Sequence, residues 1–192
     1  MPLLPALAFA RQLIEGRLKN GGRALDGTAG NGRDTLFLAQ LGGGNGKVWA
    51  FDIQAQALSN TAGLLRENGV EGQVELIAAS HADLADYVRE PLDAAMFNFG
   101  YLPGGDKTVT TKADSSVRAM QAAAVLLAEG GLLTAVVYSG HPAGRAEAAA
   151  IEQWAAALPQ EQYQVLHYRF TNQRNHPPQL LAIEKRIRKP NR

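Results

Sequence analysis

Carboxylates and glycines lie close together in the segment Asp-Gly-Thr-Ala-Gly-Asn-Gly-Arg-Asp, which begins at Asp26. This residue ends a short apolar run, and Gly27, Gly30 and Gly32 follow it. Glycine lets the backbone adopt positive φ, and it lets a ligand lie directly against the chain. A run with helical spacing begins at Asp34, so the segment predicts a strand, a tight nucleotide-binding loop and a helix. A glycine-rich turn without a ligand is the alternative.

The acid ahead of the glycines discriminates between classes of nucleotide. A dinucleotide site has Gly-x-Gly-x-x-Gly and places a pyrophosphate at the helix N-terminus, where Asp26 would repel it. A P-loop would end in Gly-Lys-Ser or Gly-Lys-Thr, which the sequence lacks. The order acid-Gly-x-x-Gly-x-Gly suits S-adenosylmethionine, whose amino group and sulfonium are cationic and whose adenosine carries no phosphate. The predicted cofactor contacts in this loop are Asp26, Thr28, Gly30, Asn31, Gly32 and Asp34.

Length and composition indicate one globular domain over residues 1–192, with 46% apolar residues, 19% charged residues and a net charge of +1. The absence of cysteine excludes disulfides, zinc ribbons, iron–sulfur ligation and cysteine nucleophiles, and we predict no metal site. The first residues lack the basic start of a signal peptide and lead into an amphipathic helix. No apolar run approaches the roughly 18 residues that span a bilayer. We therefore expect a cytoplasmic protein without a membrane partner.

Apolar runs of strand length alternate with segments of helical spacing. Strands are expected at 24–26, 47–52, 74–78, 92–98, 132–138, 163–170 and 180–186. Helices are expected on Leu7 to Leu18 and at 34–41, 54–68, 111–127 and 145–157, with Ala55, Leu58, Ala62 and Leu65 on one face of the third. This alternation predicts an α/β fold, a Rossmann-like methyltransferase sheet of seven mostly parallel strands with helices on both faces. The last two strands have no helix between them, which favours an antiparallel terminal hairpin.

Polar residues follow the predicted strands at their carboxyl ends, where such sheets bind ligands. Asp52 lies 20 residues after Gly32, the offset at which a carboxylate accepts both ribose hydroxyls. Capping of the next helix is the alternative for this acid. Ile53 would then pack on the adenine, and Ser80 or His81 would contact its edge, although His81 could equally be a helix-start residue. The predicted nucleoside contacts are Asp52, Ile53, Gln54, Ser80 and His81.

The fourth predicted strand ends in Asn98-Phe99-Gly100-Tyr101. The form Asn/Asp-Pro-Pro-Tyr/Phe at this place marks methyltransferases that act on amino nitrogens. There the amide oxygen and backbone carbonyls accept the amine hydrogens, and the aromatic ring stacks on the target base. This sequence keeps the asparagine and the aromatic residue but replaces both prolines, so the analogy is partial. An ordinary loop with a buried asparagine cap is the alternative.

Five motifs together resemble a small bacterial family labelled "putative rRNA methylase", whose members are tRNA methyltransferases of the MnmM type. The motifs lie at 26–35, 80–81, 98–107, 138–141 and 172–178, so the resemblance covers nearly the whole chain. It implies a class I enzyme that transfers a methyl group from S-adenosylmethionine to the amine of 5-aminomethyl-2-thiouridine at the wobble position of tRNA.

An alkyl amine of this kind has a pKa near that of lysine, about 10.4, and is protonated at neutral pH. Selecting its neutral form at pH 7 costs about 4.6 kcal/mol, so the site must lower that pKa or accept the proton. Asp106 and His141 are the candidate acceptors, water is an alternative, and Asn98 is the candidate orienting residue. Lys107 could lower the pKa of the amine or hold a phosphate, and a solvated turn is the alternative for it. The predicted catalytic residues are Asn98, Tyr101, Asp106 and His141, and Asn98 is also a predicted cofactor contact. The predicted substrate contacts are Tyr101, Lys107, Arg174 and Asn175.

Basic residues near the C-terminus could contact RNA phosphates, namely Arg169, Arg174, His176 and the tail 184–192. A merely solvated tail is the alternative, and the net charge of +1 does not argue for nucleic acid. The leading interpretation is a methyltransferase whose partner is the anticodon region of tRNA. Methylation of rRNA or of a small-molecule amine, and a non-catalytic S-adenosylmethionine-binding protein, are the other hypotheses. The sequence leaves open whether the chain forms a homodimer.

Overall fold

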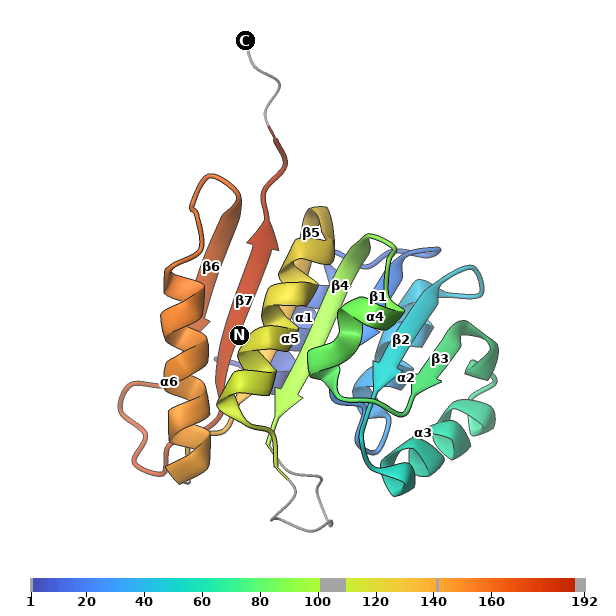
Figure 1. Ribbon diagram of the computed structural model, residues 1–192, viewed down its shortest axis with the longest axis horizontal. Helices are drawn as coiled ribbons and strands as arrows, with labels where there is room; N and C mark the ends of the chain where they lie inside the picture. The colour runs from blue at the N-terminus through green and yellow to red at the C-terminus, as the bar shows by residue number, and fades with distance from the viewer. Residues whose placement is uncertain (1, 101–109, 141, 189–192) are drawn as a thin grey trace.

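The computed structural model describes residues 2–100, 110–140 and 142–188 (Figure 1). Within them seven strands form one sheet in the order β3-β2-β1-β4-β5-β7-β6. The strands are β1 (Arg23–Asp26), β2 (Lys47–Phe51), β3 (Val74–Ile77), β4 (Leu92–Phe99), β5 (Leu127–Val137), β6 (Tyr163–Tyr168) and β7 (Gln179–Lys185). Strands β1 to β5 are parallel, whereas β7 is antiparallel to both β5 and β6. The predicted α/β fold with an antiparallel terminal hairpin is confirmed.

Helices cover both faces of this sheet. They are α1 (Ala6–Glu15), α2 (Arg33–Gly42), α3 (Ala55–Glu67), α4 (Leu84–Tyr87), α5 (Ala113–Leu126) and α6 (Pro142–Ala156). Helices α1 and α2 lie behind the sheet in Figure 1, and α4, α5 and α6 lie in front of it. Within the described ranges, no helix combines the length and the apolar character needed to cross a membrane.

Two apolar cores lie on the two faces of the sheet, and β4 contributes to both. Ala94 and Met96 belong to the core under α1 and α2, whereas Phe97 and Phe99 belong to the core under α5. Successive side chains of a strand point to opposite faces. Asn98 therefore points toward the α1 and α2 face, at the carboxyl end of β4.

The structure differs from the sequence prediction where α5 meets β5. We expected a helix to Leu127 and a strand from Leu132, but β5 already begins at Leu127. Leu127 pairs with Leu92 and Leu132 pairs with Ala94, so β5 carries extra residues between two consecutive pairings. Gly130 has a φ of +77° in this irregular stretch. The expected glycine turn is thus accommodated inside the strand.

The four apolar residues expected on one face of α3 are not all buried. The buried residues of this helix are Ala57, Thr61 and Leu65, so only Leu65 of the four is fully buried. Thr61 is held against the loop after β1, where its hydroxyl donates to the Gly30 carbonyl (3.0 Å). The short helix α4 and the 3₁₀ turns Glu71–Gln73 and His81–Asp83 were not predicted.

Gly27 marks the closest approach of the loop to β4. Its amide donates to the Met96 carbonyl (2.9 Å), and a Cβ at this position would overlap the buried ring of Phe97. Gly27→Ala should therefore lower the free energy of unfolding by about 1 to 3 kcal/mol, the usual cost of overpacking. Urea denaturation measures this change.

Gly63 is the matched control, because it lies inside α3 and a Cβ there has no atom within 4 Å. Gly63→Ala should raise the free energy of unfolding by up to about 1 kcal/mol through helix propensity alone. Equal effects of the two substitutions would contradict the steric argument for Gly27.

Candidate functional site

Asp26 ties the end of β1 to the loop and to α2. Its carboxylate is 1% exposed, and Oδ1 accepts the Thr28 amide hydrogen (3.0 Å) while Oδ2 accepts the Thr35 hydroxyl (2.6 Å). A buried carboxylate is tolerated only when such donors replace water. Both Asp26 oxygens thus hold the loop in shape, and its direct contact with the cofactor stays a prediction.

The pKa of Asp26 is raised from 3.8 to about 7, chiefly by burial. The negative charge of Asp34 contributes to this rise, whereas the hydrogen bonds from Thr35 and Thr28 oppose it. A carboxyl that titrates near neutrality responds to nearby cations, because an opposite charge favours its ionised form. A cationic ligand on the loop would therefore promote ionisation of Asp26.

The glycines of the loop expose its backbone. Gly30 and Gly32 have φ values of +54° and +81°, which an L side chain rarely adopts. The Gly30 amide donates to Asp52 Oδ2 (2.9 Å), so the loop closes onto the residue that follows β2. A Cβ on Gly32 would come within 2.9 Å of the Thr61 backbone, which leaves no room for a side chain.

Asp52 lies between the loop and α3. Its Oδ1 accepts the Gln54 amide hydrogen (2.9 Å) and its Oδ2 accepts that of Gly30, so each oxygen has one protein donor. A carboxylate oxygen has two lone pairs, and one on each remains to accept a ribose hydroxyl. Both sequence hypotheses for Asp52, support of the helix start and ribose binding, are compatible with this geometry. The neighbouring Ile53 is 65% exposed, so its apolar side chain is accessible to a ring.

His81 begins the 3₁₀ turn after β3, and Ser80 caps this turn by accepting the Ala82 amide hydrogen (3.2 Å). The backbone of His81 is therefore that of a residue at the start of a helical turn, as one of the two sequence hypotheses expected. Its ring lies edge-on to Phe97 and Phe99, with centroids 6.4 and 5.7 Å away. Burial lowers the pKa of His81 despite its hydrogen bond with the Gly27 backbone, so the ring is neutral at physiological pH. Its contact with adenine stays a prediction.

Asn98 is held by the loop and by α2. Its backbone N–H donates to the Thr28 hydroxyl (2.7 Å), and its side-chain Nδ2 donates to Asp34 Oδ2 (3.4 Å). Because a carboxylate only accepts hydrogen bonds, the amide nitrogen must face Asp34. Oδ1 of Asn98 is buried and has no partner among the described residues. An unpaired buried acceptor costs about 1 to 3 kcal/mol unless a ligand donates to it.

Arg11 completes this arrangement from α1. Its Nε (2.9 Å) and Nη2 (2.7 Å) both donate to Asp34 Oδ1, and its guanidinium lies over the ring of Phe37 at 5.4 Å. The sequence analysis missed Arg11, because no spacing rule links a residue of the first helix to one 23 positions later. Thr35 and Thr61 were likewise missed as supporting residues, although a polar residue on the buried face of a helix is a usable signal.

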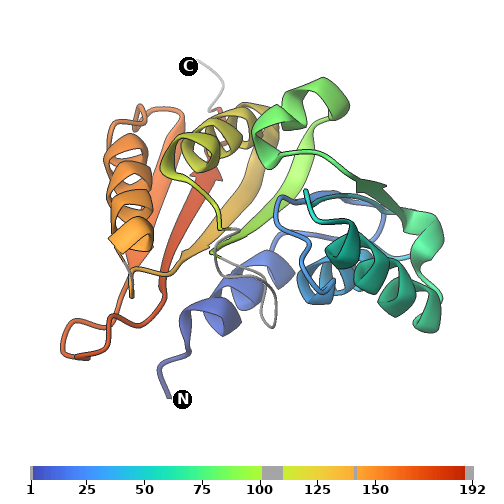
Figure 2. The same cartoon turned by 60° about the horizontal axis from the view of Figure 1, so that its bottom comes forward.

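The remaining predicted site residues differ in what the structure describes of them. Tyr101, Asp106, Lys107 and His141 lie outside the described residues. Arg174 and Asn175 are exposed in the loop between β6 and β7, which comes forward with the N-terminal segment in Figure 2. Asn31 accepts a hydrogen bond from Asn60 Nδ2 of α3 (3.0 Å). The structure thus gathers Asp26, Asp34, Asp52 and Asn98 around one glycine loop.

The buried carboxyl of Asp26 should make stability depend on pH. At low pH it is protonated in both states, whereas at higher pH the unfolded chain ionises it above 3.8 and the folded chain only above about 7. The cost to folding therefore grows across this interval and is complete above it. The free energy of unfolding of wild type minus that of Asp26→Asn should fall by about 2 to 4 kcal/mol from about pH 4 to pH 8.

Urea denaturation at several pH values measures this difference, and its pH-independent part reports the altered hydrogen bonds. Asp114→Asn, an exposed change in the first turn of α5, is the matched control. A wild-type minus Asp26→Asn difference that stays flat over the whole interval would contradict the raised pKa.

Comparison with known proteins gives a coherent set of relatives. A family model described as "Putative rRNA methylase" matches residues 48–184. A chloroplastic tRNA (mnm(5)s(2)U34)-methyltransferase of Arabidopsis thaliana is 36% identical over 164 residues, which are 80% of this chain and 60% of that protein.

Two solved structures are also close in sequence and in fold. One, described as a putative rRNA-methylase from Clostridium thermocellum, is 37% identical with a TM-score of 0.95 and covers 96% of this chain and 100% of its own. The other, a putative methyltransferase from Streptococcus mutans in complex with SAH, is 34% identical with a TM-score of 0.88 and covers 96% of this chain and 99% of its own.

Proposed function

The chain belongs to the "Putative rRNA methylase" family, and we propose that it methylates the amine of 5-aminomethyl-2-thiouridine at the wobble position of tRNA, giving 5-methylaminomethyl-2-thiouridine. The family match and the SAH complex of the S. mutans relative confirm the predicted class, an S-adenosylmethionine-dependent methyltransferase. The name of the A. thaliana relative supports tRNA as the substrate. The observation that carries the proposal is the buried, unpartnered Oδ1 of Asn98 at the end of β4.

The residues of the loop fit S-adenosylmethionine. Gly30 and Gly32 present bare backbone, Asp52 keeps a free lone pair on each oxygen for the ribose, and Ile53 presents its exposed side chain to the adenine. The ionisable Asp26 beneath the loop supplies negative charge for a cationic ligand. When bound, S-adenosylmethionine supplies a methyl group on a sulfonium, which is electrophilic without help from an acid or a metal.

Asn98 is suited to an amine nucleophile. Its Oδ1 accepts one N–H of the neutral amine and turns the nitrogen lone pair toward the methyl carbon. S-adenosylmethionine would supply the methyl carbon as its bond to sulfur breaks, and the nitrogen would give up one proton. A carboxylate here would favour the ammonium and raise the pKa of the amine, whereas the neutral amide does not. Asp106 and His141 stay the predicted proton acceptors.

Arg11 serves Asn98 through Asp34. Its two hydrogen bonds fix the carboxylate, and its positive charge offsets the negative charge that would otherwise face the substrate amine. The amide group of Asn98 then has one orientation before substrate binds. Such preorganisation contributes to catalysis because a misplacement of about 1 Å can cost about 100-fold in rate.

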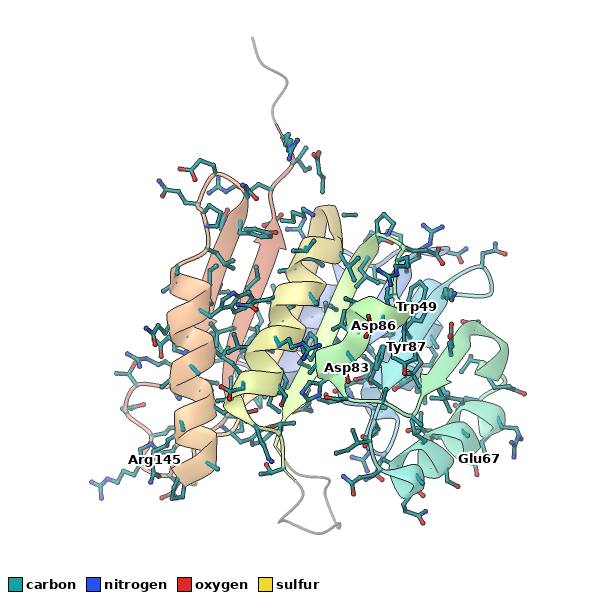
Figure 3. All side chains as sticks on the ribbon, in the orientation of Figure 1. Trp49, Glu67, Asp83, Asp86, Tyr87 and Arg145 are labelled. Atoms are coloured by element: carbon teal, nitrogen blue, oxygen red, sulfur yellow. The ribbon has the colours of Figure 1, made fainter. Side chains whose placement is uncertain are left out.

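Exposed arginines at the carboxyl edge of the sheet are available for RNA phosphates. Arg33 begins α2, and Arg169 and Arg174 lie in the loop between β6 and β7. Arg145 lies near the start of α6 and points outward in Figure 3. Phosphate contacts of this kind supply affinity and weaken with salt. They support a nucleic-acid substrate over a small-molecule amine.

Nucleoside mass spectrometry tests the reaction directly. Bacterial tRNA that carries 5-aminomethyl-2-thiouridine is incubated with the protein and methyl-labelled S-adenosylmethionine, and bacterial rRNA is treated in parallel. We expect the mass of one labelled methyl group on that nucleoside and none on rRNA. Labelling of rRNA alone would overturn the proposal in favour of the activity that the family label names.

Asn98 and Arg11 should affect turnover more than cofactor binding. We expect Asn98→Ala to lower kcat by about 100-fold, because the amine loses its orienting acceptor. Arg11→Gln should lower kcat by about 10-fold, and Arg11→Lys should recover part of the loss, since lysine keeps the charge but not the two-pronged contact. Steady-state kinetics separate kcat from the KM for S-adenosylmethionine.

Arg17→Gln is the control for Arg11, because Arg17 follows α1 and pairs with Glu184 on the surface (2.8 Å). It should leave kcat unchanged. Turnover of Asn98→Ala equal to that of the wild type would show that the Asn98 amide does not position the amine.

A further inference from the structure

A mostly apolar pocket of about 350 Å³ lies between the N-terminal segment and the carboxyl edge of the sheet. Its walls include Leu3 and Leu7 on one side and Tyr138, Phe170, Pro177 and Pro178 on the other. The loop between β6 and β7 supplies the last three of these residues. None of the steps described so far uses this pocket.

The pocket exists because one face of the sheet extends past the strand ends. Tyr138, Phe170 and Pro178 each lie two positions along the chain from a residue of the apolar group under α1, namely Val136, Tyr168 and Leu180. Side chains two apart in extended chain share a face. The three residues therefore continue the α1 face beyond the point where the helix covers it.

This face is also the one to which Asn98 points, and two placements relate the pocket to the site. An ideal Cβ built on Gly100, two residues after Asn98, would lie 3.6 Å from the Tyr138 ring, so the chain after β4 passes close to Tyr138. Leu7 lines the pocket, and Arg11 follows it one helical turn later, about 6 Å along the axis. The pocket therefore lies on the same face and at the same edge of the sheet as the proposed amine position.

The lining of the pocket suits a nucleobase. Tyr138 is 36% exposed and Phe170 is half-buried, so both rings have surface left on which a base can stack. Gln173 adds an amide that can donate to and accept from a base edge. The exposed Arg169 and Arg174 of the same loop can hold the phosphates on either side.

We propose that this pocket stacks the base of the nucleotide next to the one that is methylated. The inference rests on the proposed function, because it takes the RNA strand to place its target nucleotide at Asn98. Single-stranded RNA is commonly recognised in this way, with splayed bases on aromatic side chains. The pocket then favours RNA over a free nucleoside, because only RNA carries a neighbouring base that can fill the pocket while the target nucleotide lies at Asn98.

Fluorescence of 2-aminopurine tests the stacking without methyl transfer. Two anticodon stem-loop RNAs are made, each with 2-aminopurine on one side of the wobble nucleotide. We expect the wild-type chain to quench the fluorescence of one of them. Phe170→Leu should weaken the affinity for that RNA about 5-fold or more, whereas Phe170→Tyr should retain it.

Phe170 packs on Tyr168, with ring centroids 5.6 Å apart, so thermal melting must show that the leucine variant is folded. Tyr138→Leu is the second variant and should give the same loss, because it removes the other aromatic ring of the pocket. Val125→Ala, which removes an exposed side chain near the end of α5, should leave affinity unchanged.

An abasic nucleotide at the quenched position completes the test. It should raise the KM for RNA in the wild type but add little in Phe170→Leu, because both changes remove the same interaction. Methylation of tRNA without quenching of either probe, or quenching that survives both leucine variants, would overturn the pocket assignment and leave the proposed function intact. Quenching without methylation would support the pocket and overturn the proposed reaction, and absence of RNA binding would overturn both.

Discussion

Burial of one carboxylate, that of Asp26, is the constraint on which the rest of the site depends. A buried acid needs donors, and the structure supplies them from the Thr28 amide and the Thr35 hydroxyl, that is, from the loop and from α2. Satisfying the acid therefore fixes the path of the loop between them. The Thr28 hydroxyl accepts the amide hydrogen of Asn98, so the same constraint sets the end of β4.

The negative charges of the three acids in the site are balanced differently from one acid to the next. Asp34 raises the pKa of Asp26, and Arg11 opposes the charge of Asp34 with two hydrogen bonds. Asp52 is bound to backbone amides on both oxygens. Negative charge is thus concentrated under the loop, where the cationic cofactor would lie, and is compensated near Asn98, where the proposed amine substrate would lie.

The parts of the fold that the sequence predicted are encoded by local patterns. Apolar runs and glycines located β1, β2 and the loop because strand, turn and helix start are specified within about ten neighbouring residues. The terminal hairpin was predictable because no helix separates its strands. By contrast, Arg11 and Thr61 act through contacts made only after distant elements pack, and Asp26 turned out to support the loop through Thr35.

Strand β7 runs antiparallel to its neighbours, and this reversal bears on how the enzyme can evolve. The hairpin brings the loop between β6 and β7 to the carboxyl edge of the sheet (Figure 1). Among the described residues, those that hold the glycine loop in shape come from other elements. Under the proposed function, methyl donor and methyl acceptor would be bound by opposite halves of one sheet that meet at Asn98. Substitutions in the hairpin loop would then alter which acceptor is chosen while the donor half is preserved, so that substrate range and cofactor chemistry would evolve separately.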